Sequence, residues 1–242
     1  GWFDLVVNGG GPITLSYELP NYLPAQRLLQ VPWQHWMTAP DVVLLAKDTT
    51  EVQPIELPPG GTGTFGVHQG SWAGEGTSRQ RRPVLLFPSG TIATRRGPGV
   101  QATVLDSLSV RTTEYTGTPY KEQAMPADLP PNVAYTYAVE LGADEVDPLA
   151  GETLEFSQPV VFYLENFLGD QTDPMGRFGV GRKVPVGTYD RKAGVWMPES
   201  DGRVIKILSR GSSTVEVDAD GDGQADVAPD ALVSAEERLE LF

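Results

Sequence analysis

Short stretches in which apolar and polar residues alternate run through most of the chain. In the clearest, 132–145, five apolar residues share one face of an extended strand: Val133, Tyr135, Tyr137, Val139 and Leu141. Similar alternation, or short apolar runs bounded by turn residues, predicts further strands. These cover 2–7, 13–19, 22–33, 41–46, 83–95, 102–116, 153–169, 183–199 and 203–209. The pattern therefore predicts an all-β chain.

A helix is expected only at the end of the chain. Ser234 is followed three residues later by Glu237, the spacing of a capping box. Nearby apolar side chains supply a surface that such a helix could bury: Leu232, Val233, Leu239 and Leu241. We expect one short C-terminal helix.

One segment interrupts the strand pattern and suggests how the chain is divided. Residues 57–82 are rich in glycine, serine and threonine and end in three arginines over four positions, which is typical of a linker or long surface loop. We therefore expect four parts. They are a short group of strands at 1–56, the linker at 57–82, a β-sandwich at 83–211, and an acidic loop with the terminal helix at 212–242.

Composition narrows the possible functions. With 27 glycines and 21 prolines in 242 residues, the chain suits many strands joined by turns. It has no cysteine, which excludes disulfides and thiolate zinc sites. A formal charge of −14 repels phosphate backbones, so no nucleic-acid partner is expected. No apolar run approaches the ~18 residues of a membrane span, and no signal peptide is expected. Because Gly1 and Trp2 already look strand-like, the sequence suggests a piece of a larger polypeptide.

The most specific chemical motif is DADGDGQADVAPD at 218–230. Its aspartates alternate as in an EF-hand-type calcium loop, with a glycine where the chain must turn sharply. The predicted calcium ligands are Asp218, Asp220, Asp222, Gln224 through its backbone carbonyl, Asp226 and Asp230. Pro229 stands where a bidentate glutamate is usual, and 213–217 is strand-like where a helix is usual. The alternative is a solvated acidic turn. If calcium binds, we expect it to tie the strand at 203–209 to the terminal helix.

Catalytic motifs are weaker. His68 lies near Ser71 and Glu75, which raises a Ser-His-acid hypothesis, but the stretch has no G-x-S-x-G nucleophile elbow. His35, between two tryptophans, fits a core or interface position better. Many acidic residues leave a glycosidase pair open, although nothing in the context of Glu140, Glu155 or Glu165 distinguishes them. We expect no catalytic residues.

Two surface hypotheses stay open. Five tryptophans could form stacking platforms for carbohydrate, although ordinary core and interface positions would also use them: Trp2, Trp33, Trp36, Trp72 and Trp196. Five arginines could form a basic docking patch on this acidic chain, or a solvated loop: Arg79, Arg81, Arg82, Arg95 and Arg96.

Several stretches resemble known families. FDLVVNGGGPITLSYELPNYLPAQR (3–27) resembles the later strands of the transthyretin-like, or carboxypeptidase regulatory-like, β-sandwich, although Asn21 replaces the usual glycine before Tyr22. The longer run, through VPW at 31–33 and DVVLL at 41–45, resembles the segment before the YD-repeat shell of teneurins and bacterial RHS proteins. Large bacterial RHS proteins have a further region after that segment. Four later stretches of this chain resemble it: 134–145, 156–169, 184–209 and the DxDGDG loop.

The resemblance implies a transthyretin-like remnant at 1–56 and a fibronectin- or Ig-like sandwich at 83–211, acting as a plug or spacer without catalytic residues. The partner would be the YD-repeat shell elsewhere in a secreted or cell-surface bacterial protein, which encloses a toxin or displays an adhesion module. Residues 1–48 supply too few strands for a complete sandwich, so the remaining strands are expected upstream or from another element. A carbohydrate- or surface-binding module is the alternative, and an uncharacterised hydrolase the second alternative.

Overall fold

A computed structural model describes residues 1–49, 54–58, 60–61, 63–74, 80–131, 134–168, 178–227 and 233–241. In this part of the chain the first strands are β1 (Gly11–Tyr17), β2 (Ala25–Val31), β3 (Ile55–Glu56), β4 (Gly66–Gln69), β5 (Pro83–Phe87), β6 (Ala93–Gly97), β7 (Val100–Leu105), β8 (Ser107–Leu108) and β9 (Val110–Glu114). The later strands are β10 (Val139–Ala143), β11 (Thr153–Phe156), β12 (Val161–Leu164), β13 (Lys183–Val184), β14 (Gly187–Asp190), β15 (Val195–Pro198), β16 (Gly202–Arg203), β17 (Lys206–Arg210) and β18 (Val215–Asp218).

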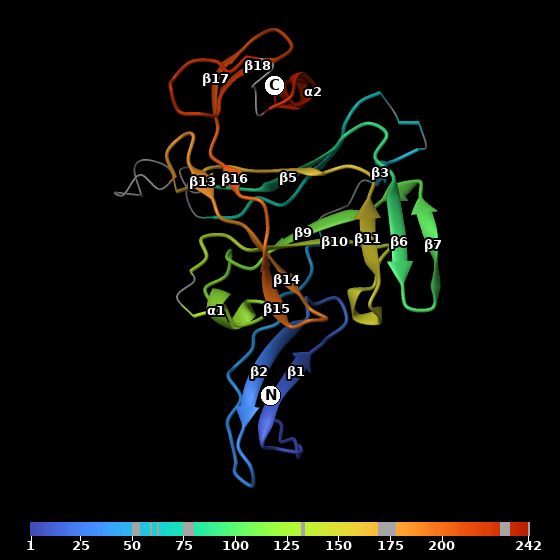
Figure 1. The fold of residues 1–242 in the computed structure, drawn as a ribbon, viewed down its shortest axis with the longest axis vertical. Helices are drawn as coiled ribbons and strands as arrows, with labels where there is room; N and C mark the ends of the chain where they lie inside the picture. Colours follow the sequence, from blue (N-terminus) through green and yellow to red (C-terminus); the bar gives the residue numbers. More distant parts are fainter. Residues whose placement is uncertain are drawn as a thin grey trace. The chain divides into compact units, whose positions relative to one another are not determined.

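Helical structure is short and sparse. The described helices are α1 (Lys121–Ala124), the 3-10 turn η1 (Pro148–Ala150) and α2 (Ala235–Glu240). In α2 the Ser234 side chain accepts a hydrogen bond from the Glu237 N–H, and the Glu237 carboxylate accepts one from the Ser234 N–H, which completes the predicted capping box. The predictions of an all-β chain and a short C-terminal helix are confirmed (Figure 1).

The described residues form two compact units, each assembled from separate stretches of sequence. The first unit consists of Gly1–Asp48, Thr113–Glu140 and Thr188–Met197. The second consists of Thr49–Thr112, Leu141–Gly187 and Pro198–Phe242. The four-part division expected from the sequence stays a prediction.

The first unit contains the β1–β2 hairpin, in which Ile13 lies opposite Leu29 and Leu15 opposite Arg27. Alternate residues of β2 are buried, as expected for a strand with one covered face. The core of the unit joins distant stretches of sequence, because Leu23, Tyr115 and Met125 pack together with the partly buried Leu45 and Trp196.

In the second unit, two three-stranded sheets have the orders β11–β6–β7 and β12–β5–β4. Figure 1 shows β6 between β11 and β7. The side chains of the two sheets share one hydrophobic core, in which Leu85 and Phe87 of β5 pack with Ala93 of β6 and the partly buried Leu154 of β11. A smaller core beneath the β17–β18 hairpin contains Val215, Val217 and Val233. This second core fixes the start of the acidic loop.

Three local expectations differ from the structure. Residues 2–7 form no strand, and 41–46 contributes only an isolated bridge between Tyr22 and Ala46. Strand composition alone does not make a strand, because the backbone also needs a neighbouring strand in register. Conversely, the glycine-rich segment 57–82 contains β4, which pairs with β5 from Gly66 opposite Phe87 to Gln69 opposite Val84. Glycine is favoured at position 66 because a Cβ there would clash with the Ile55 side chain of β3.

Candidate metal centre

The acidic loop begins at the buried end of β18. Val217 and Asp218 are both almost fully buried, so packing of the strand fixes the first carboxylate of the loop. Asp218 accepts hydrogen bonds from the N–H groups of Gly221, at 2.6 Å, and Gly223, at 3.0 Å. Both glycines have positive φ, 87° and 82°, which L side chains rarely adopt. The sharp turn predicted at Gly223 is therefore present.

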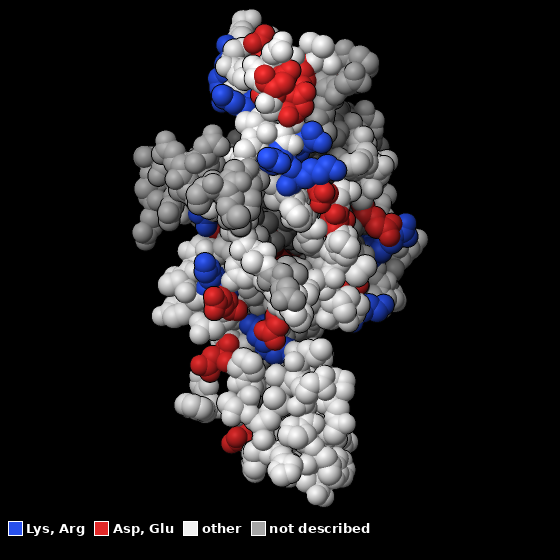
Figure 2. Space-filling view, turned by 60° about the vertical axis from the view of Figure 1, so that its left-hand side comes forward, with Lys and Arg blue, Asp and Glu red and all other residues white. Residues whose placement is uncertain are grey.

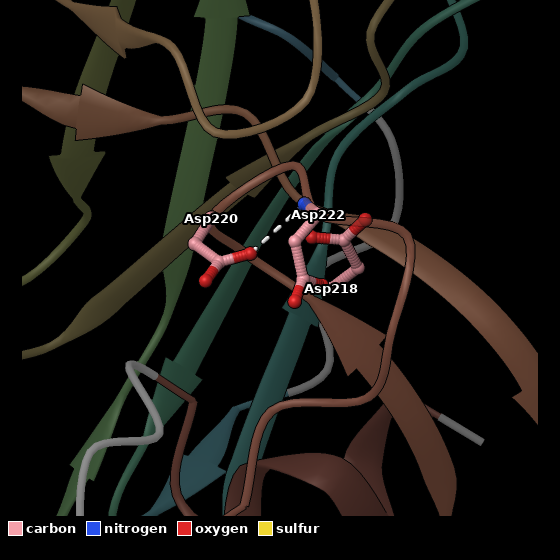
Figure 3. Close-up of side chains that lie close together, drawn as sticks. All are labelled: Asp218, Asp220 and Asp222. Atoms are coloured by element: carbon pink, nitrogen blue, oxygen red, sulfur yellow. Dashed lines mark hydrogen bonds between the residues drawn. The ribbon is translucent and has the colours of Figure 1, made fainter.

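The alternating aspartates converge. Ligand oxygens of Asp218, Asp220 and Asp222 all lie within 4.8 Å of one another (Figure 3). The latter two side chains are exposed, and each carboxylate accepts a hydrogen bond from the backbone N–H two residues later, on Asp222 and Gln224. Three carboxylates close together on a tight loop offer the oxygen ligands that Ca²⁺ prefers. The backbone N–H groups also stabilise the same charges without a cation.

The ligand prediction also includes three residues besides this group of carboxylates: Gln224, Asp226 and Asp230. The Asp226 carboxylate accepts a hydrogen bond from the Ala219 N–H at 2.7 Å, and its own N–H donates to the Val217 carbonyl at 2.8 Å. Asp226 thus closes the base of the loop. The Gln224 side-chain amide lies 3.3 Å from an Asp222 carboxylate oxygen. Asp230 and Pro229 lie outside the described residues. The ligand set as a whole stays a prediction.

The loop is held from two sides. A Cβ on Gly221 would lie 2.6 Å from the Val180 carbonyl oxygen, and one on Gly181 would lie 2.2 Å from the Asp220 carbonyl oxygen. The two backbones can approach this closely only because both residues are glycines. On the other side, the Arg238 guanidinium of α2 donates to the carbonyls of Asp226 and Val233. A cation in this loop would therefore act on the packing of the terminal helix.

The helix has a second anchor. The Tyr163 hydroxyl of β12 donates to the Glu237 carboxylate, 3.1 Å away. Burial and the neighbouring Glu237 charge raise the pKa of Tyr163 far above its usual range, so the phenol stays protonated and remains a donor. Glu237 thus serves both the capping box and the contact with β12.

The residues of the Ser-His-acid hypothesis are only partly described. A ring nitrogen of His68 on β4 lies 3.2 Å from the Thr112 hydroxyl, and Glu75 lies outside the described residues. His35 is exposed, which does not fit a core position, and the alternative of an interface position stays a prediction. One small hollow in the second unit is lined by Glu56, Phe87 and Ser89, among others. Its cavity volume of about 10 Å³ leaves room for about one water molecule.

Each of the three candidate glutamates is engaged within its own unit. Glu155 pairs with Arg96, and Glu165 accepts a hydrogen bond from the Arg82 N–H at 2.6 Å. Glu140 pairs with Arg191, with 2.6 Å between carboxylate oxygen and guanidinium nitrogen. Each of the three carboxylates therefore has a partner within its own unit.

The basic-patch hypothesis is also modified by internal contacts. The Arg81 guanidinium lies 4.2 Å from the Phe167 ring centroid, and that of Arg82 lies 4.5 Å from the ring centroid of Trp72. Arg96 is paired with Glu155. Arg79 lies outside the described residues. These arginines stack on aromatic rings or pair with carboxylates inside the second unit.

Two arginines that the sequence did not single out organise the first unit. Arg27 of β2 is 2% exposed and donates to the carbonyls of Gln123, at 2.8 Å, and Met125, at 3.1 Å. Arg191 binds Glu140 and also lies 3.3 Å from the hydroxyl of the buried Tyr115. No local signal marks either residue, because their partners are distant in sequence.

The β14–β15 hairpin brings Arg191 to this position. In its turn, the Asp190 carboxylate accepts hydrogen bonds from the N–H groups of Lys192 and Ala193. The Tyr189 hydroxyl donates to the Gln26 side chain at 2.8 Å, and the Trp196 indole donates to the Asp128 carbonyl at 3.0 Å. This late hairpin thus fastens the β2 strand of the N-terminal segment.

The N-terminal segment has known relatives. Residues 1–44 match the family model of the teneurin TTR-like domain. Over 33 residues the chain is 54% identical to Teneurin-m of Drosophila melanogaster. These 33 residues make up 14% of this chain and 1% of that protein. The aligned part of the chain therefore spans only a small fraction of that relative's length. No solved structure matches the chain.

The teneurin TTR-like match confirms the teneurin-like and transthyretin-like resemblance of the N-terminal strands. It covers β1, β2 and the loop that follows them. Most of the contacts described for Arg27, Arg191 and Tyr189 lie beyond the matched segment. The bacterial RHS context stays a prediction.

The tryptophans are mostly exposed. Trp2, Trp33, Trp36 and Trp72 expose more than half of their surface, whereas Trp196 packs against the core of the first unit. Trp33 and Trp36 lie in the irregular segment after β2, where Gln34 has a positive φ of 57°. Their exposure keeps the surface-binding alternative open, although they do not form a row on a sheet face. None of the described helices is long and apolar enough to cross a membrane.

Proposed function

We propose that the chain is a non-catalytic structural module, a plug or spacer, of a large secreted or cell-surface protein of the teneurin-like type. The observation that carries this proposal is the match of residues 1–44 to the teneurin TTR-like domain. That segment has only two strands of its own, and residues from 113–140 and 188–197 pack with it in one compact unit. A segment completed by distant stretches of its own chain suits a structural connection.

The chemistry of the described side chains supports a structural role. The candidate glutamates Glu140, Glu155 and Glu165 bind arginines or backbone groups of their own unit. The hollow beside Glu56 and Phe87 has room for about one water molecule, far less than the ~300 Å³ of a small ligand pocket. The arrangement therefore favours packing over turnover.

Calcium is proposed as the stabilising ion of the acidic loop. Support comes from the three carboxylates of Asp218, Asp220 and Asp222, whose ligand oxygens lie within 4.8 Å of one another. Two carboxylates about 4 Å apart repel each other by roughly 1 kcal/mol even in water. A bound cation would remove this repulsion and hold the loop against α2 through Arg238. The ion would act as a clasp, with no part in catalysis.

The wider context is also part of the proposal. We place the module next to a YD-repeat shell of a bacterial RHS-type protein, whose cargo would be a toxin or adhesion module. The flanking coding sequence provides a direct test. A YD-repeat array beside this module supports the proposal, and a parent gene without such an array overturns it.

A carbohydrate- or surface-binding module is the second candidate, and the exposure of Trp33 and Trp36, 65% and 87%, favours it. Aromatic rings of this kind present large apolar faces to a ligand. A glycan array tests this alternative. Binding that is lost in the Trp33→Ala and Trp36→Ala variants, but kept in Trp72→Ala, would support it. The absence of binding to any glycan would exclude the carbohydrate form.

A further inference from the structure

Two strands of the second unit carry basic side chains at facing positions. In the β13–β16 pair, Lys183 lies directly opposite Arg203, and Arg182 precedes Lys183 in the chain. All three residues are exposed. Directly opposed residues of antiparallel strands have their Cβ atoms about 5 Å apart on one face of the sheet, where like charges destabilise the pairing. Arg182, Lys183 and Arg203 are called the basic cluster below.

The backbone holds the basic cluster in place. The Gly181 N–H donates to the Val204 carbonyl at 2.8 Å, and the Val204 N–H donates to the Arg182 carbonyl at 2.9 Å. Gly181, with a positive φ of 81°, and Arg182 therefore share one partner on the opposite strand, which is the arrangement of a β-bulge. The Arg203 guanidinium donates to the Ala219 carbonyl at 3.3 Å. Uncharged backbone groups thus fix the cations close together and leave their charges in place.

Within the described part of the chain, no ion pair includes a side chain of the basic cluster. Four arginines elsewhere each pair with a carboxylate: Arg27, Arg96, Arg111 and Arg191. The chain has 32 acidic and 18 basic residues, so carboxylates are abundant and cations are the minority. A group of three cations without a carboxylate partner therefore stands out on this chain. An anion bound between the opposed cations would remove the repulsion that their pairing imposes.

The surroundings of the basic cluster indicate what kind of anion fits. Figure 2 shows a compact group of basic side chains just below the acidic side chains at the top of the view. The Asp220 backbone closely approaches Gly181, and the exposed Asp201 lies two residues before Arg203. A long polyanion would have to pass such carboxylates, and the formal charge of −14 repels it. A short acidic segment needs only the cluster itself, because salt limits charge interactions to roughly 8 Å.

We propose that the basic cluster is a docking site for a short acidic peptide segment of a partner protein. One carboxylate of the segment binds between Lys183 and Arg203, and a neighbouring carboxylate binds Arg182. A guanidinium group can bind a carboxylate through two parallel hydrogen bonds, which makes arginine the preferred residue for such contacts. Because the Ala219 carbonyl already orients Arg203, little further ordering of this side chain is required on binding. The contact requires no calcium and is independent of the proposed calcium clasp.

The first experiment measures the binding of a labelled peptide by fluorescence anisotropy. The probe peptide has three consecutive glutamates between glycine and serine residues, and the control peptide has glutamines in their place. EDTA in the buffer keeps the result independent of any cation in the acidic loop. We expect the glutamate peptide to bind and the glutamine peptide not to bind, with an affinity that falls about tenfold when the salt concentration is raised tenfold. A glutamate peptide that does not bind overturns the proposal.

Variants of the same protein locate the binding site. Lys183→Gln and Arg203→Gln should each weaken binding of the glutamate peptide about tenfold, because each removes a charge-assisted contact. Lys47→Gln is the matched control, since Lys47 is an exposed lysine of the first unit, and it should bind like the unaltered protein. Equal losses in all three variants would overturn the proposal. Tighter binding of a sulfated oligosaccharide than of the peptide, lost in the same two variants, would overturn the choice of a peptide partner.

A second measurement separates a binding role from a structural one. Removal of one of two opposed cations relieves repulsion in the protein without peptide, so Lys183→Gln should raise Tm by about 1–3 °C although it weakens peptide binding. A residue that only stabilises the fold would give the opposite sign when replaced. A lower Tm of Lys183→Gln would contradict the repulsion between Lys183 and Arg203 on which the proposal rests.

Discussion

The Arg191 guanidinium and the Glu140 carboxylate lie 2.6 Å apart in the first unit, and both side chains are largely buried. The same Glu140 oxygen accepts a hydrogen bond from the Tyr115 hydroxyl at 2.9 Å. Arg191 belongs to the β14–β15 hairpin, Glu140 to β10, and Tyr115 follows β9. One charged cluster thus joins three stretches that are far apart in sequence.

Replacement of Arg191 should destabilise the protein. Arg191→Met removes the cation and leaves Glu140 partly buried without its partner, which should lower the free energy of unfolding by about 1–3 kcal/mol. Urea denaturation followed by circular dichroism measures the loss. Arg96→Met is the matched control, because the Arg96–Glu155 pair is about half exposed and surface pairs contribute about 0–1 kcal/mol. Equal losses in the two variants would show that Arg191 has no special role.

Alkaline pH should weaken the same cluster. Burial, followed by the charge of Glu140, raises the pKa of Tyr115 far above its usual value of about 10. The folded state therefore favours the protonated phenol, and this contribution to stability is complete below pH ~10. As pH rises above ~10, the unfolded chain loses its proton first, so the free energy of unfolding should fall by up to about 1.4 kcal/mol per pH unit. Tyr163 should contribute in the same direction.

Urea midpoints measured between pH 8 and 11 test this expectation. Tyr115→Phe should be less stable at neutral pH, because it lacks the hydrogen bond to Glu140, but its stability should fall less steeply above pH ~10. Tyr120→Phe, at an exposed position, is the control and should keep the full slope. An unchanged slope in Tyr115→Phe would contradict the assignment to Tyr115.

The sequence predicted features that depend on neighbours in the chain. The capping box of Ser234 and Glu237 needs only a spacing of three, and the convergence of Asp218, Asp220 and Asp222 needs only alternation around a glycine turn. Both are present. Trp2–Val7 has the composition of a strand, but a strand also requires a partner that composition does not specify.

Long-range contacts were not predictable in the same way. Arg191 lies in a turn sequence, DRKAG, that suggests solvent exposure, yet it binds Glu140, which is 51 residues away. Arg27 is buried because the carbonyls of Gln123 and Met125 surround its guanidinium. Such contacts follow from the fold, and no local pattern announces them. Asp226 differs from these two arginines, because its carboxylate accepts a hydrogen bond from the Ala219 N–H only seven residues earlier.

Calcium should stabilise the protein against heat. An ion that binds only the folded state adds about 2.7 kcal/mol at one hundred times its dissociation constant, so millimolar Ca²⁺ should raise Tm by several degrees and EDTA should reverse the rise. The double variant Asp220→Asn/Asp222→Asn should lose this response, because two of the three clustered carboxylates are removed. Asp201→Asn, an exposed carboxylate outside the loop, should keep it. A melt that does not change with Ca²⁺ in the unaltered protein would exclude the proposed calcium clasp.

Alanine substitutions at Gly221 and Gly223 distinguish the cost of backbone strain from the cost of a steric clash with a neighbouring backbone segment. Gly221 and Gly223 have nearly equal φ values of 87° and 82°, so an alanine at either position should cost about 1–2 kcal/mol of strain. A Cβ at Gly223 meets nothing within 4 Å, whereas one at Gly221 would lie 2.6 Å from the Val180 carbonyl oxygen. Gly221→Ala should therefore lose roughly 1–3 kcal/mol more than Gly223→Ala, because the two backbone segments must separate. Urea denaturation of the two variants without Ca²⁺ measures this difference, and equal losses would show that the contact with Val180 does not hold the loop.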